Sequence, residues 1–125
     1  MNFVKCELCG AIAGVIKNGH PLVCCGKNMT VLAANTVDAS KEKHVPVVKV
    51  SGNTVIVTVG SAPHPMEEAH HIGFIYLETE QGGQRKAPKI GGSPAAVFTL
   101  ADGDAPRAAY EYCNLHGLWK TEIKP

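Results

Sequence analysis

The amino-acid sequence predicts an all-β protein in two parts, a small metal-binding hairpin domain over residues 1–36 and an antiparallel β-sandwich over residues 37–125. Four of the five cysteines lie within the first 25 residues. After them, runs rich in β-branched and aromatic residues alternate with Gly, Pro, Asn and Asp clusters, and no segment keeps an apolar repeat of helical period beyond a turn or two. The predicted strands include Val47–Val50, Thr54–Val59, Ile72–Thr79, Ala95–Leu100 and Leu118–Ile123.

In the first domain, Cys6 and Cys9 lie on one tight turn. Residues 17–21 contain an Asn-Gly pair, which predicts a hairpin that returns Cys24 and Cys25 to the first two cysteines. Four thiolates that converge in this way suit tetrahedral iron or zinc. Because neighbouring side chains on an extended backbone diverge, we expect the adjacent pair to be bent. A structural zinc clamp and a redox-active iron both remain open at this point.

Composition limits the possible functions. Hydrophobic residues make up 45% of the chain and charged residues 18%, which excludes a disordered protein. The net charge of +1 argues against nucleic acid as a partner, because such binding depends on an excess of basic groups. No apolar run approaches the roughly 18 residues of a membrane span, and the start of the chain does not resemble a signal peptide. We therefore expect a cytoplasmic protein whose cysteines bind metal rather than form disulfides.

Residues 36–46 are expected to form a linker into the sandwich. A second group of possible metal ligands begins within this linker. Five of the six histidines lie in three short segments. Prolines in or beside the first two segments favour extended backbone, so these loops are stiff enough to hold ligands in definite directions. The segments are Glu42-Lys43-His44-Val45-Pro46, Pro63-His64-Pro65-Met66-Glu67-Glu68-Ala69-His70-His71 and Tyr112-Cys113-Asn114-Leu115-His116-Gly117.

Cys113 and His116 follow a predicted strand near the C-terminus, which is also typical of a blue-copper sandwich with one Cys, two His and a weak axial Met. That site needs a Met shortly downstream, yet Met1, Met29 and Met66 all precede Cys113. A copper electron carrier with a zinc-binding N-terminal domain is therefore the alternative hypothesis, and a zinc-ribbon interaction module is the third.

Together, the C-x-x-C and VCCG cysteines and the three histidine segments resemble desulfoferrodoxin, the two-iron form of superoxide reductase, over essentially the whole chain. The resemblance implies a desulforedoxin-like domain with an Fe(SCys)4 centre, followed by an immunoglobulin-like sandwich with an Fe(His)4Cys centre. The implied iron ligands are Cys6, Cys9, Cys24 and Cys25 in the first centre, and His44, His64, His70, Cys113 and His116 in the second. His71 is not expected to be a ligand.

The resemblance also implies an activity, the reduction of superoxide to hydrogen peroxide with one electron and two protons. Lys43 precedes a ligand, so we expect its charge to attract the anion and to help deliver a proton. The resemblance gives Glu42 the task of occupying the open coordination position once the iron is oxidised. It further implies a rubredoxin-like electron donor and a homodimer.

Overall fold

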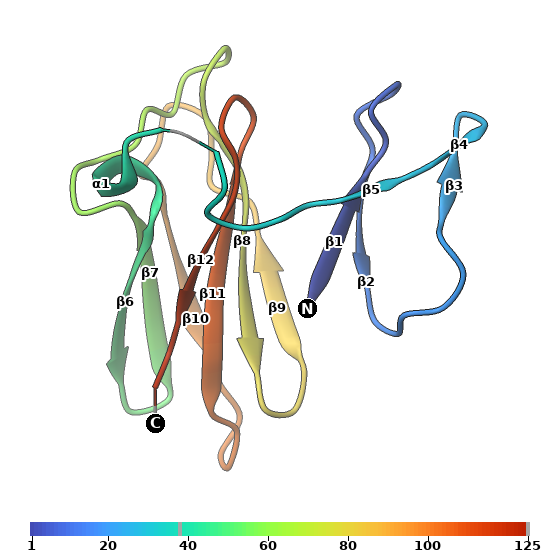
Figure 1. The fold of residues 1–125 in the computed structure, drawn as a ribbon. Coiled ribbons are helices and arrows are strands. Elements are labelled where there is room, and N and C mark those ends of the chain that lie inside the picture. Colours follow the sequence, from blue (N-terminus) through green and yellow to red (C-terminus); the bar gives the residue numbers. More distant parts are fainter. Residues whose placement is uncertain (38, 125) are drawn as a thin grey trace. The chain divides into compact units, whose positions relative to one another are not determined.

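The computed structural model describes residues 1–37 and 39–124, and the chain divides into two compact units, Met1–Ala33 and Ala34–Pro125 (Figure 1). In the described residues, every strand pair of both units is antiparallel. None of the helices in the described part of the chain is long and apolar enough to cross a membrane.

The first unit consists of two small sheets. Strand β1 lies between β2 and β5 in a three-stranded sheet, and β3 pairs with β4. These strands are β1 (Asn2–Lys5), β2 (Ile12–Val15), β3 (Val23–Cys24), β4 (Lys27–Asn28) and β5 (Thr30–Val31). The hairpin predicted across residues 17–21 is not formed, because β2 pairs backwards with β1 and β3 pairs forwards with β4. Each of these two hairpins carries one pair of cysteines at its turn.

The second unit is a sandwich of two antiparallel sheets, with strand orders β10-β7-β6 and β12-β11-β8-β9. Its elements are α1 (Lys41–His44), β6 (Pro46–Ser51), β7 (Thr54–Val59), β8 (Ile72–Thr79), β9 (Gly83–Lys86), β10 (Ala95–Thr99), β11 (Pro106–Cys113) and β12 (Gly117–Glu122). The predicted sandwich is confirmed. Strand β9 was not foreseen, because Gly, Gln, Arg and Lys are poor strand formers.

The core lies between the two sheets of the sandwich. On β7, Val55, Val57 and Val59 are fully buried and alternate with partly exposed residues, as expected for a strand with one face against the core. Ile75 of β8 and Phe98 of β10 are buried in the same cluster. Burial of this apolar surface is the main stabilising contribution to the scaffold that carries the second metal constellation.

Side chains connect the two sheets at both edges of the sandwich. On one side, Gln84 of β9 donates a hydrogen bond of 2.9 Å to the carbonyl of Thr99, and Lys86 donates to the carbonyl of Val97. On the other side, Thr121 donates one of 2.6 Å to the carbonyl of Pro46. These bonds satisfy carbonyl groups that an open edge strand would leave unpaired.

Asn35 explains where the second unit begins. Its backbone N–H donates to the carbonyl of Leu118 at 3.0 Å, and its side-chain amide exchanges two hydrogen bonds with the backbone of Lys120, at 2.9 and 3.2 Å. Residues 34–36 therefore group with the sandwich, so the unit boundary lies three residues before the end of the predicted first domain, residues 1–36.

Candidate metal centres

The four N-terminal cysteines lie at the turns of the two hairpins of the first unit. Cys6 follows β1, and the turn closes with hydrogen bonds from Cys6 N to Ala11 O (2.8 Å) and from Gly10 N to Cys6 O (2.9 Å). In the second hairpin, Cys25 and Gly26 have left-handed φ angles of 53° and 76°. A left-handed residue reverses the chain direction, so the adjacent cysteines can face one side. This is the bend expected from the sequence for the Cys24–Cys25 pair.

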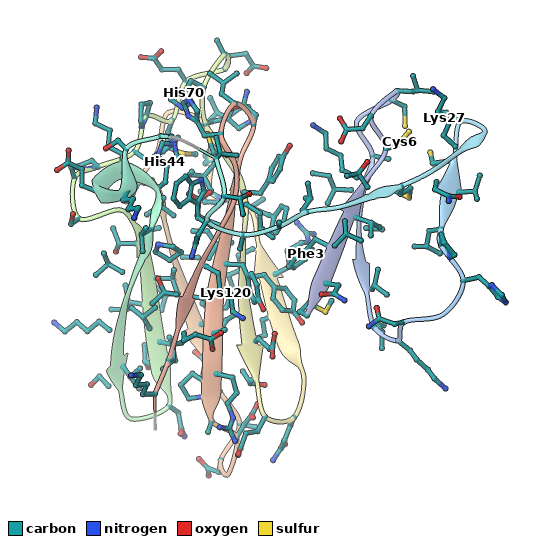
Figure 2. All side chains as sticks on the ribbon, in the orientation of Figure 1. Phe3, Cys6, Lys27, His44, His70 and Lys120 are labelled. Atoms are coloured by element: carbon teal, nitrogen blue, oxygen red, sulfur yellow. The ribbon has the colours of Figure 1, made fainter. Side chains whose placement is uncertain are left out.

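The separations of the four sulfur atoms fit a single tetrahedral ion. All four lie within 4.8 Å of one another, and Figure 2 shows sulfur atoms gathered near the labelled Cys6. The Sγ atoms of Cys9 and Cys24 are 3.6 Å apart, and those of Cys24 and Cys25 are 3.9 Å apart. A tetrahedron with metal–sulfur bonds of about 2.3 Å has edges of about 3.8 Å. None of the cysteines forms a disulfide.

The acid–base behaviour of the thiols also favours a cation between them. The backbone N–H of Cys9 donates to the Cys6 sulfur at 3.4 Å and lowers the pKa of Cys6 to about 6. By contrast, hydrogen bonding with the Cys9 sulfur is the largest of the effects that raise the pKa of Cys24 to about 12. The pKa of Cys25 is raised for the same principal reason. Four thiolates this close together are stable only when a positive charge offsets their repulsion.

The second constellation lies at one end of the sandwich. His44 is the last residue of α1, His64 and His70 lie in the loop from β7 to β8, and Cys113 ends β11. His116 lies in the turn from β11 to β12. Figure 1 shows α1 and these two connections at the same end of the sheets, and Figure 2 shows His44 and His70 close together there. Segments more than 70 residues apart in sequence thus meet at one place.

The four imidazole rings form a closed cycle. The distances between the centroids of neighbouring rings are 4.8 Å for His44–His64, 4.7 Å for His64–His70, 5.2 Å for His70–His116 and 4.8 Å for His116–His44. All four neighbouring pairs meet edge to face, at 73° to 85°, whereas His44 and His70 face each other across the cycle at 6.5 Å. This arrangement gives the four rings a common centre.

Hydrogen bonds at the outer nitrogens leave ring nitrogens available for a metal at this centre. The Nδ1 atoms of His44 and His64 donate to the carbonyls of Ser40 and Pro65, at 2.6 and 2.7 Å, so Nε2 of each ring carries the lone pair. Nε2 of His64 and Nε2 of His70 are buried and have no hydrogen-bond partner among the described residues. Such buried ring nitrogens without a partner fit a site that holds a cation.

Burial favours the neutral form of the His44, His64 and His70 rings. Burial lowers the pKa of His64 to about 4, and it also lowers the pKa values of His44 and His70. Charge repulsion from the other histidines further disfavours protonation of His44 and His64. Neutral imidazole is the form that binds metals, so burial in this fold favours metal binding by these histidines.

Cys113 supplies the sulfur of this constellation. Its side chain is fully buried, its Sγ lies 3.9 Å from Nδ1 of His116, and burial raises the pKa of its thiol. The ligand atoms of His44, His70, Cys113 and His116 all lie within 4.8 Å of one another, and His64 completes the ring cycle. Four imidazoles exceed the two that a blue-copper centre uses, and the sulfur of Met66 instead accepts a hydrogen bond from Ile72 N at 3.4 Å.

Glu42 and Lys43 lie beside the cluster on α1, and both side chains are exposed. The charge of Lys43 contributes to the lowered pKa values of both His44 and His70, so its positive field reaches the cluster. His71 lies outside the ring cycle, with Nδ1 at 3.0 Å from the carbonyls of Glu67 and Glu68.

Two residues near the cluster lie outside the three histidine segments of the sequence. Trp119 stacks on the His44 ring, with centroids 5.1 Å apart, and donates from Nε1 to the carbonyl of His116 at 3.1 Å. Gly60 packs so tightly against α1 that a Cβ there would lie 2.2 Å from the carbonyl oxygen of Glu42. The Trp119–His44 and Gly60–Glu42 contacts join segments that are distant in sequence, so no local pattern indicates them.

Comparisons with known proteins agree with this geometry. The family model described as desulfoferrodoxin matches residues 36–122, and the model of the desulfoferrodoxin N-terminal domain matches residues 1–32. A desulfoferrodoxin from Syntrophotalea carbinolica is 51% identical over 119 residues, covering 94% of this chain and 93% of the relative. The crystal structure of the superoxide reductase from Treponema pallidum matches with a TM-score of 0.81 and 38% identity, over 95% of this chain and 98% of that chain.

A shorter relative matches part of the chain. The superoxide reductase (1Fe-SOR) from Giardia intestinalis has a TM-score of 0.58 and 36% identity, and the match covers 68% of this chain and 100% of that chain. The cysteine set and the histidine–cysteine set correspond to the two iron sites of desulfoferrodoxin. On the strength of both family models and of relatives that match nearly end to end, the chain belongs to the desulfoferrodoxin family.

Proposed function

We propose that this protein is a superoxide reductase, which converts superoxide, one electron and two protons into hydrogen peroxide. The observation that carries the proposal is the closed cycle of four imidazoles next to the buried Cys113 sulfur. Family membership and the superoxide reductases among its relatives support the same activity.

The residues that would hold the second iron are His44, His64, His70, His116 and Cys113. Ferrous iron bound by this set would supply the single electron that superoxide needs. The Nδ1–H bonds of His44 and His64 to backbone carbonyls hold these two rings in the orientation and tautomer that bind metal. The thiolate of Cys113 contributes the one anionic ligand of the set, and its burial keeps water from competing for it.

Lys43 and Glu42 have complementary roles in the proposal. The exposed Lys43 lies next to a ligand, so its ammonium group attracts the superoxide anion and brings a proton to the developing peroxide. The carboxylate of Glu42 covers the open side of the site after oxidation, as the family resemblance implies. The backbone of Glu42 is held in place, because its carbonyl accepts hydrogen bonds from Ala62 N at 2.9 Å and Ser61 Oγ at 3.3 Å.

The remaining parts of the proposal concern partners and location. The electron comes from a small rubredoxin-like carrier, and the protein is a homodimer, both as the family resemblance implies. We place the protein in the cytoplasm, because five unpaired cysteines persist in a reducing compartment. Reduction of the loaded protein by purified rubredoxin tests the donor, and sedimentation analysis tests the dimer.

The decisive experiment mixes the reduced, iron-loaded protein with superoxide without oxygen and measures both products. The proposal requires one hydrogen peroxide for each superoxide consumed and no dioxygen. Release of one dioxygen for every two superoxide ions would indicate dismutation and would overturn the proposal. Metal analysis and a visible spectrum of the same sample distinguish iron from zinc in the first centre, because zinc thiolates do not absorb visible light.

A further inference from the structure

The four histidines of the second centre are not held in the same way. The rings of His44 and His64 are each oriented by a hydrogen bond from Nδ1 to a backbone carbonyl. The backbone of His116 is held by Trp119, and its ring faces His44 with Nδ1 at 3.1 Å from Nε2. The ring of His70 has no hydrogen bond to any described residue, although its Nε2 is buried. The His70 ring contacts the His64 and His116 rings edge to face, but no hydrogen bond fixes it, so its orientation depends on how its backbone is held.

That backbone is held by Asn114. The Oδ1 of Asn114 accepts a hydrogen bond from His71 N at 2.9 Å, and its Nδ2 donates to the carbonyl of Ala69 at 3.0 Å. A third bond, from Asn114 N to the carbonyl of His71, is 3.2 Å long. Asn114 thus binds the residues on both sides of His70.

Because of its position in the chain, Asn114 connects two segments that carry ligands. It directly follows Cys113, so the clamp connects the residue beside the sulfur ligand to the two residues that flank a nitrogen ligand. Its side chain is exposed, so it adds little to the core of the sandwich. The two backbone hydrogen bonds of His70 itself, with Glu67 at 2.9 and 3.1 Å, lie within the same loop and cannot connect that loop to β11.

We propose that Asn114 is the positioning residue for His70: its side-chain amide holds the 69–71 segment at a set distance from Cys113 and thereby aims a ring that has no hydrogen bond of its own. Loss of the clamp leaves the other ligands in place but lets His70 turn away from the common centre. The inference rests on the ligand set of the proposed function. Its readout is metal affinity rather than superoxide turnover, so either proposal can fail without the other.

The test compares Asn114→Ala with the unmodified full-length protein in a cobalt(II) titration against a competing chelator. Cobalt absorbs differently in an all-sulfur set and in a mainly nitrogen set, so the two centres are followed separately. We expect the second-centre affinity to fall about 10- to 100-fold, as is typical when the residue that orients a ligand is removed. The ligand-field bands of that centre should also shift, while the first centre fills as before.

A double-mutant cycle shows whether the effect passes through His70. In a His70→Ala background, Asn114→Ala should cost no further affinity, because the ring that the clamp aims is gone. In a His64→Ala background, the loss caused by Asn114→Ala should persist. An equal loss in both backgrounds would indicate general loosening of the end of the sandwich and would overturn the proposal, as would an unchanged affinity in Asn114→Ala alone.

Two further variants control for the chemistry of the substitution. Asn35→Gly removes an equivalent amide clamp, which bonds the backbone of Lys120, and glycine keeps the φ of 61° found there. It should lower thermal stability without changing cobalt affinity. Asn114→Asp keeps the acceptor for His71 N but turns a carboxylate oxygen toward the carbonyl of Ala69, so it should weaken the second centre as well. Full affinity in Asn114→Asp would exclude the Nδ2 contact from the clamp.

Discussion

The two metal centres of this protein are built in opposite ways. The ligands of the first centre lie within 20 residues, on two hairpin turns, and the side chains of Cys9 and Cys25 are exposed. The ligands of the second span residues 44–116 and meet at the end of a packed sandwich, where His44, His64 and Cys113 are buried. The first centre depends on local turn geometry, whereas the second depends on the fold of the whole unit.

This difference indicates where the stability of each unit comes from. The main hydrophobic core cluster lies entirely in the second unit, with Phe98 and Ile75 among its members. In the described part of the first unit, only Phe3, Val4 and Cys6 are buried hydrophobic residues. A unit this small gains much of its folding free energy from its metal. We therefore expect metal removal to unfold the first unit while the sandwich keeps its structure.

We expect the largest effect from replacing the sulfur ligand of the second centre. Cys113→Ser keeps the size of the side chain but replaces the thiol by a hydroxyl that stays protonated at neutral pH and binds iron weakly. We expect superoxide reduction to be abolished, even in molecules that keep some iron there. The first centre serves as the internal reference, because its thiolate absorption should not change. Full activity in Cys113→Ser would remove the thiolate from the mechanism.

The reciprocal change tests the independence of the two centres. Cys24→Ser removes one of four sulfurs from a site whose shape depends on the ion, so the first metal should be lost and the strands of the first unit should lose protection from hydrogen exchange. The second centre should keep its iron and still consume superoxide. Metal content and turnover of the same preparation provide the measurement. Loss of both metals together would contradict the comparison between the units.

The sequence alone could predict some strands and the ligand segments, but not how all the strands pair. The strands Thr54–Val59 and Ile72–Thr79 were predicted with the bounds that the structure has, because their side chains carry β-branched and aromatic groups. The ligand segments could be found because histidine and cysteine are chemically distinctive. The hairpin predicted across residues 17–21 was wrong, because an Asn-Gly turn signal indicates a chain reversal but not which strands pair, and Ile12–Val15 pairs with Asn2–Lys5 instead.

The contacts that hold the second centre in shape were harder to predict. Trp119 on β12 and Gly60, directly after β7, contact residues of α1 from parts of the chain that are distant from it in sequence. Strand β9 forms despite its composition, because its backbone pairs with β8 and its side chains cover the edge of β10. Such features depend on which elements meet, and a single sequence carries no direct signal of that.

Gly60 offers the next test of this dependence on the fold. Its φ is 70°, and a Cβ at this position would lie 2.2 Å from Glu42 O and 2.7 Å from Lys43 Cα. Gly60→Ala should therefore displace α1 together with His44, lower the iron affinity of the second centre, and lower the free energy of unfolding by more than the roughly 1–2 kcal/mol of left-handed strain alone.

Gly52 provides a matched control for Gly60. It is also left-handed, with a φ of 59°, but a Cβ there would meet nothing within 4 Å. Thermal unfolding and cobalt titration of Gly60→Ala and Gly52→Ala then separate strain from the contact with α1. Equal losses of stability and unchanged metal affinity in both variants would show that the close approach of Gly60 does not position the ligand.

We expect the smallest effect from removing the positive charge of Lys43 beside the second centre. Lys43→Ala should slow the reaction with superoxide by up to about tenfold at low salt and flatten its dependence on ionic strength, because steering of an anion acts over the Debye length. Lys49→Ala is the matched control, since it removes the same charge from an exposed position on β6. Stopped-flow rates across a salt series give the comparison. If Lys43→Ala has the same salt profile as the unmodified protein, Lys43 does not steer superoxide. If Lys49→Ala flattens the profile equally, the effect comes from net charge and not from the position of the ammonium group beside His44.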